Sequence, residues 1–101
     1  MTAYLIVEEN VTDPEGFQKY RKSGVATTIQ HFGGKTLAAG GTIEMLEGDW
    51  HPNRLVILEF ESVEQAKRWY HSDEYAPLKD IRLKSTNSQA VLVQGIYSEK
   101  S

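Results

Sequence analysis

The sequence contains no cysteine, which excludes disulfide bonds and thiol chemistry and is compatible with a reducing compartment. It also has no apolar run approaching the roughly 20 residues that a membrane-spanning helix needs. The N-terminal segment has no basic residues ahead of its short apolar run, and acidic residues follow at once, which is unlike a signal peptide. We therefore expect a soluble, cytoplasmic protein with no membrane partner.

An excess of positive charge is also missing. The 11 basic residues are outnumbered by 14 acidic ones, and the formal net charge is −3. This balance provides no electrostatic footprint for nucleic acid or an anionic membrane. The side chains of Glu8, Glu9 and Glu59 lie on predicted strands, where they would repel the phosphates of an RNA. We expect no nucleic-acid partner.

The sequence lacks a recognisable metal or nucleophile motif. His31, His51 and His71 are widely spaced, with no pair four residues apart and no nearby carboxylate motif. No serine lies in a nucleophile-elbow pattern. We expect neither a metal nor a cofactor.

What is present predicts one domain, residues 1–101, because 101 residues with 40% hydrophobic content make a real but modest core. Its clearest part is the run Arg54–Phe60, which is short, apolar and β-branched and therefore predicts a buried strand. Alternation along this strand places Arg54 and Glu59 on opposite faces. Ser62 and Gln65 then form a capping box that begins an amphipathic helix.

The rest of the pattern predicts further strands and helices around this segment. One long helix is expected from Asp13 as N-cap to Phe32, with Gly24 in its interior at a cost of about 1 kcal/mol relative to alanine. Gly33 is expected to end it in the left-handed conformation. The expected elements are a strand at 3–11, a helix at 14–32, a strand at 35–47 interrupted at Gly40–Gly41, a strand at 54–60, a helix at 63–70, a helical piece that Ser72 or Asp73 caps, a loop at 85–88 and a strand at 89–96.

This order, β-α-β-β-α-β, predicts an α+β, ferredoxin-like fold with an antiparallel sheet. Helices would cover one face of the sheet and leave the other bare. Both alternating sets of strand residues contain Leu, Ile or Val, so the bare face would be apolar and would need a partner. We expect two copies to meet sheet to sheet as a two-fold homodimer.

A combination of mainly glycines, aromatic residues and charged residues is distributed along the chain: Gly33, Gly34, Gly41, Glu47, Gly48, Trp50, Arg54, Glu59, Phe60, Ala66, Trp69, Tyr70, His71, Ser72, Glu74, Tyr75 and Arg82. Together these residues resemble the family called domain of unknown function 1330. The resemblance runs over nearly the whole chain and ends at Val93-Gln94-Gly95. It implies membership of the dimeric α+β barrel group, and hence a homodimer with facing sheets. It implies no activity; the wider group includes cofactor-independent monooxygenases, isomerases and haem-handling proteins, which is an analogy of fold only.

Arginines and aromatic residues gather around the predicted strand start, the loop before it and the end of the helix that follows. Arg54 and Arg82 suit the two-point recognition of a carboxylate, and the aromatic rings could hold a flat ring. The alternative is structural: the arginines pair with Glu47, Glu59 or Asp80, and Trp69 and Tyr70 belong to the core. The candidate ligand-binding residues are Glu47, Trp50, Arg54, Tyr70, Ser72, Tyr75 and Arg82.

Three hypotheses of function stay open. The first is binding of a compact polar or aromatic molecule that carries a carboxylate. The second is a non-catalytic structural or assembly module. The third is a cofactor-independent monooxygenase or isomerase, for which the sequence names no acid or base; Glu59, an acid among apolar strand residues, is either a general base or a charge that reaches water or the dimer partner.

Overall fold

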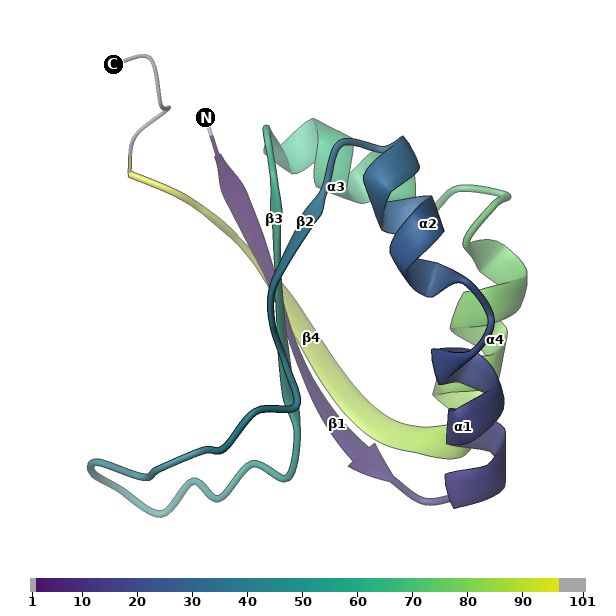
Figure 1. Ribbon diagram of the computed structural model, residues 1–101. Coiled ribbons are helices and arrows are strands. Elements are labelled where there is room, and N and C mark those ends of the chain that lie inside the picture. The colour runs from purple at the N-terminus through teal and green to yellow at the C-terminus, as the bar shows by residue number, and fades with distance from the viewer. Residues whose placement is uncertain (1, 97–101) are drawn as a thin grey trace.

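The computed structural model describes residues 2–96 and shows an α+β fold in two layers, a four-stranded sheet with its helices on one side (Figure 1). The strand order is β2-β3-β1-β4, and every neighbouring pair is antiparallel, as a ferredoxin-like fold requires. The elements are β1 (Ala3–Val11), α1 (Pro14–Arg21), α2 (Val25–His31), β2 (Lys35–Ala39), β3 (Leu55–Phe60), α3 (Val63–Tyr70), α4 (Ala76–Ser85) and β4 (Thr86–Gln94).

The central strands have the predicted two-sided character. In β1 the side chains of Leu5 and Val7 are buried towards the helices, and in β3 those of Leu58 and Phe60 are. The paired registers Leu5↔Leu58 and Leu5↔Leu92 bring these inward residues into one layer. This layer and the inner sides of the helices form the core, in which Trp69 is 2% exposed.

The prediction of one long helix from Pro14 to Phe32 is wrong, because the structure has two short helices there. Gly24 adopts φ +88°, a left-handed conformation that cannot continue a helix, and becomes the N-cap of α2. Downstream of the break, Gly33 has φ +75° and ends α2 as predicted. The amide of Gly34 donates to the carbonyl of Ile29 at 2.9 Å, which completes a Schellman motif.

The expected continuation of the second strand to Glu47 is also wrong. The strand β2 ends at Ala39, its bulge lies between Thr36 and Ala38, and Gly40 turns the chain with φ +74°. Residues 40–53, called the arm below, contain no helix or strand. Figure 1 shows the arm projecting to the side of the sheet away from the helices.

The second half of the chain departs from prediction in two details. Ser62 caps α3 by accepting from the amide of Gln65 at 3.0 Å, but the Gln65 side chain donates to the carbonyl of Phe32 instead of returning to Ser62. The expected loop at 85–88 does not exist, because α4 runs to Ser85 and β4 begins at Thr86. The helix can stop there without a loop since Thr86 takes an extended backbone and its hydroxyl donates to the carbonyl of Arg82 at 2.7 Å.

The sheet face opposite the helices is bare in the single chain. The register aligns Ile6 of β1 with Ile57 of β3 and Val91 of β4 across this face. Val91 and Val93 are 61% and 47% exposed. The prediction of an apolar uncovered face is therefore confirmed for the described strands.

Candidate functional site

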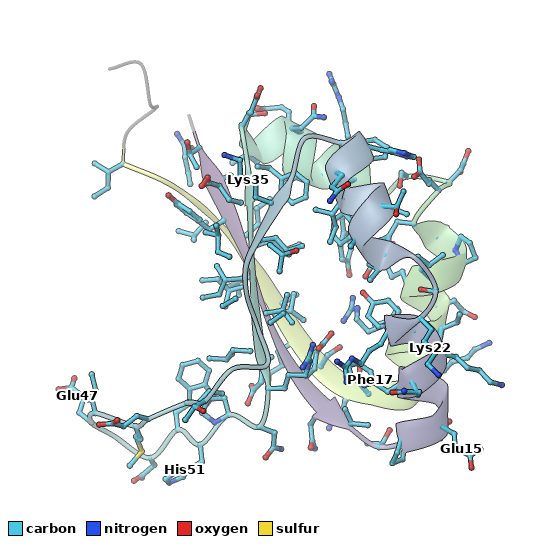
Figure 2. All side chains as sticks on the ribbon, in the orientation of Figure 1. Glu15, Phe17, Lys22, Lys35, Glu47 and His51 are labelled. Carbon is cyan, nitrogen blue, oxygen red and sulfur yellow. The ribbon has the colours of Figure 1, made fainter. Side chains whose placement is uncertain are left out.

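A cavity of about 230 Å³ lies between the sheet and the helices. Its walls are mainly apolar and come from β1, β2, β3 and all four helices. One end is polar and is formed by Glu9, Tyr20, Arg54, Tyr75 and Arg82. Figure 2 shows Phe17, another wall residue, pointing from α1 towards the sheet.

An ion pair forms one side of this polar end. The Nε of Arg54 donates to Oε1 of Glu9 at 3.0 Å, and the Arg54 guanidinium lies 5.5 Å from the centre of the Phe17 ring. Glu9 is 3% exposed, and such burial of a carboxylate needs this kind of pairing. Gly40 lies against this arginine, because a Cβ added to it would meet the end of the Arg54 guanidinium.

A chain of hydrogen bonds forms the other side. The Nε of Arg82 donates to the Tyr75 hydroxyl at 3.2 Å, and that hydroxyl lies 2.9 Å from the hydroxyl of Tyr20. A second Arg82 nitrogen donates to the hydroxyl of Ser88 at 2.9 Å. Ser88 faces Glu9 in the β1–β4 register, so both sides of the polar end meet on adjacent strands.

These hydrogen bonds leave one phenolic hydrogen of the tyrosine pair without an acceptor among the described residues. Tyr20 and Tyr75 together carry two hydroxyl hydrogens, and the bond between them uses one of these. The Tyr75 oxygen already accepts from Arg82. The second hydrogen is therefore available to an acceptor in the cavity.

Burial raises the pKa of the Tyr20 phenol far above its usual value, and the neighbouring Tyr75 raises it further. Burial by itself would lower the pKa of the Arg82 guanidinium, but the neighbouring tyrosines Tyr75, Tyr20 and Tyr70 together more than offset this and the pKa rises. At physiological pH, Tyr20 is thus a neutral phenol and Arg82 a cation.

Arg82 is a buried cation without an anionic partner in the part of the chain that is described. It is 3% exposed. The ion pairs among residues 2–96 are His31–Glu74, Arg54–Glu9 and Lys84–Asp80, and none includes Arg82. Both of its hydrogen-bond acceptors are neutral hydroxyls. With Glu9 compensated by Arg54, the polar end keeps one uncompensated positive charge.

Aromatic rings form the wall beside this charge. Trp69 stacks on Tyr75 with ring centres 4.0 Å apart, and Tyr70 meets Trp69 edge-on at 6.3 Å. The Trp69 Nε1 donates to the Thr28 hydroxyl at 2.9 Å, which fixes the orientation of the indole. All three aromatic residues line the cavity.

The structure brings together four of the seven residues predicted for the site: Arg54, Tyr70, Tyr75 and Arg82 all line the cavity. Ser72 lies outside it and organises the turn after α3, where its hydroxyl donates to the Trp69 carbonyl and accepts from the Tyr75 amide. Ser72 therefore positions Tyr75 without facing the cavity.

The other two predicted residues lie on the arm. Trp50 donates from Nε1 to Glu8 at 3.3 Å, on the sheet face opposite the cavity. Figure 2 shows Glu47 at the outer part of the arm, far from the helices. Neither residue lines the cavity.

Sequence reasoning missed Glu9 and Tyr20 as site residues. The signal for Glu9 was present, because alternation along β1 places it on the same face as Leu5 and Val7. Tyr20 follows Phe17 at helical spacing, which identifies an inward residue but not the hydroxyl partner 55 positions away.

The remaining candidate groups lie elsewhere. Glu59 is half-buried on the bare sheet face, opposite Lys35 and Tyr4 in the register. His31 binds Glu74 through Nδ1 at 2.6 Å, and the His71 ring packs edge-on against Tyr70. Within residues 2–96, no three or more histidine, aspartate or glutamate side chains form a cluster that could hold a metal ion. No helix in that part of the chain has the length and apolarity to cross a membrane.

Solved structures share this architecture. A protein of unknown function from Rhodopseudomonas palustris superposes with a TM-score of 0.73 at 16% identity, over 95% of this chain and 83% of that one. SnoaB, a cofactor-independent oxygenase from Streptomyces nogalater, superposes with a TM-score of 0.64 at 11% identity, over 99% and 98%. A dimeric protein of unknown function from Bacteroides fragilis, described as ferredoxin-like, superposes with a TM-score of 0.61 at 14% identity. The superposition covers 93% of this chain and 96% of that one. These identities show the fold alone.

At the sequence level, no curated protein matches the chain. One family does match, over residues 2–96, which covers all the strands and helices and every residue that lines the cavity. The chain belongs to DUF1330, a family defined as a domain of unknown function.

Proposed function

We propose that this protein binds a compact aromatic carboxylate in the cavity, with the carboxylate at the polar end. The observation that carries the proposal is the Arg82 guanidinium, which is 3% exposed and has only neutral hydroxyl partners among the described residues. A buried charge without a counter-ion is costly. A ligand carboxylate would compensate it and would also accept the free phenolic hydrogen of the Tyr20–Tyr75 pair.

The size and walls of the cavity support an aromatic body. A volume of about 230 Å³ lies below the roughly 300–1,000 Å³ typical of drug-sized sites, and so suits a single ring with small substituents. The Trp69–Tyr75 stack presents flat apolar surface next to Arg82. The polar end therefore suits the carboxylate of the ligand, and the apolar walls suit its aromatic ring.

The role of Arg54 differs from that of Arg82. Arg54 already neutralises Glu9, so a carboxylate beside it would compete with Glu9. The proposal therefore places the ligand anion at Arg82, with Arg54 holding Glu9 in position.

Calorimetric titration with benzoate, phenylacetate and the neutral benzyl alcohol tests this proposal. We expect the two carboxylates to bind and benzyl alcohol to bind at least tenfold more weakly. Charge-assisted hydrogen bonds contribute about 1.5–3 kcal/mol, so Arg82→Gln should weaken carboxylate binding by about 10- to 100-fold. Arg82→Lys should keep part of the affinity because it keeps the charge.

Arg68→Gln is the matched control, because Arg68 is exposed on α3 and makes only a long 3.4 Å bond to Gln65. It should bind both carboxylates as the unchanged protein does. Absence of carboxylate binding, or equal binding by the Arg82→Gln protein, would contradict the proposal. Loss of stability in Arg82→Gln with no ligand effect would favour a structural module instead.

We further propose that the working form is a homodimer joined through the bare sheet face. Exposed Val91 and Val93 on that face form a hydrophobic surface that a second copy would cover. The Bacteroides fragilis structure of the same fold is described as dimeric, which supports a dimer by analogy. Sedimentation at micromolar concentration should give twice the chain mass; a single folded monomer would contradict it.

A further inference from the structure

We propose that the cavity catalyses proton transfer at the carbon next to a carbonyl group, with Glu9 as the base and the Tyr20–Tyr75–Arg82 chain as the stabiliser of the resulting oxyanion. This inference rests on the proposed binding of an aromatic carboxylate and narrows the ligand class to aromatic 2-oxo acids. It assigns a reaction class to residues that face each other across one cavity.

Glu9 meets the geometric conditions for a base. It is 3% exposed yet lines the cavity. The Arg54 bond engages Oε1, and among the described residues no hydrogen bond reaches Oε2. Every fully buried side-chain nitrogen or oxygen in that part of the chain has a partner, so Oε2 must reach open space. The cavity provides it, and Oε2 has lone pairs free for a proton.

The opposite side supplies what an enolate needs. Proton loss from carbon places negative charge on the carbonyl oxygen. With a 2-oxo acid bound, Arg82 holds the carboxylate, and the one free hydrogen of the Tyr20–Tyr75 pair goes to the adjacent carbonyl oxygen instead of to the carboxylate. Such donors, held in place by the fold before the reaction, stabilise a developing oxyanion strongly.

The step balances without any oxidant or metal. The C–H bond of the ligand carbon next to the carbonyl group breaks, and its proton passes to Oε2 of Glu9. The electron pair of that bond forms a C=C bond, and the carbonyl π electrons move onto oxygen. The proton on Glu9 exchanges with solvent, and transfer of the solvent-derived proton to the same carbon completes the hydrogen exchange. Protonation of the enolate oxygen instead releases the enol.

Phenylpyruvate is a suitable probe because it combines an aromatic ring, a carboxylate, a ketone and acidic benzylic hydrogens. Its exchange of benzylic hydrogen for deuterium in D₂O can be followed by NMR. We expect the protein to accelerate exchange above the buffer rate. General bases contribute about 10²- to 10⁴-fold, so Glu9→Gln should lower the accelerated rate at least 100-fold while the protein still binds phenylacetate.

Glu8→Gln is the matched control. Glu8 is adjacent in β1 but points to the bare face, where it accepts from Trp50, so its loss should leave the exchange rate unchanged. Glu9→Asp provides a second variant, which keeps the charge beside Arg54 and withdraws the carboxylate by one methylene. It should remain folded and lose most of the exchange.

The outcomes separate this inference from the proposed function. Phenylacetate binding with exchange only at the buffer rate would overturn the inference and leave the binding function standing. Full exchange activity in Glu9→Gln would also overturn it. If no aromatic carboxylate binds, the proposed function fails and the inference fails with it.

Discussion

At the scale of single residues, the polar end of the cavity shows how burial gives ordinary side chains particular roles. Arg54 and Arg82 both line the cavity, and both were predicted as ligand residues. One has a carboxylate partner at 3.0 Å, and the other donates only to hydroxyl groups. The distinction follows from which side chains lie beside each arginine in the folded protein, which a count of arginines cannot reveal.

Arg54→Ala should destabilise the protein because it leaves the Glu9 carboxylate buried without its partner. Breaking a fully buried pair costs about 3–5 kcal/mol. The Arg54 side chain is 23% exposed, so we expect about 2–3 kcal/mol, measured by urea unfolding. The double variant Glu9→Gln with Arg54→Ala should recover part of this loss. A change below about 0.5 kcal/mol for Arg54→Ala would contradict the pairing.

At the scale of elements, the break between α1 and α2 shapes the cavity. Both sides of the break line it, Arg21 at the end of α1 and Val25 at the start of α2. A continuous helix to Phe32 would be straight and could not follow the sheet in this way. The left-handed Gly24 therefore permits two helices to enclose the space.

Gly24→Ala should lower stability because alanine at φ +88° is strained. The expected cost is about 1–2 kcal/mol. This reverses the direction implied by an uninterrupted helix, in which alanine would stabilise by about 1 kcal/mol. Thermal unfolding of the two proteins measures the difference.

Gly41→Ala is the control for this prediction. Gly41 does not have a positive φ, and an added Cβ would meet nothing within 4 Å. Its stability should stay within about 0.5 kcal/mol of the unchanged protein. A stabilised Gly24→Ala protein would show that α1 and α2 can join.

At the scale of the whole molecule, the two sides of the sheet have different roles. The covered side holds the core and the cavity. The bare side carries Ile6, Ile57 and Val91 in register, and the arm projects beyond it (Figure 1). The arm also carries exposed apolar side chains, since Leu46 is 88% and Trp50 58% exposed.

Val91→Lys should weaken the proposed dimer because it places a charge among the apolar side chains of the bare face. We expect the sedimentation profile to shift towards the monomer. Leu83→Lys is the matched control, since Leu83 is a 52% exposed apolar residue on α4, in the helical layer. It should leave the profile unchanged; equal effects of both variants would place the interface elsewhere.

The sequence by itself determined the order of elements, the fold class and the inward faces of the central strands, because hydrophobic alternation, caps and glycines act locally. It also selected Arg54, Tyr70, Tyr75 and Arg82. Its errors were the helix through Gly24, the strand beyond Ala39 and the loop at 85–88. At each of these three places, a single backbone conformation or the tertiary packing decided where the helix or strand ends.

Only the tertiary structure decided which polar groups meet. Glu9 and Arg54 are 45 positions apart, and Tyr20 and Tyr75 are 55 apart. Their contacts depend on strand register and on how the helices pack over the sheet, which arise from many small interactions across the whole chain. For that reason, the compensated arginine could be distinguished from the uncompensated one only after the chain had folded.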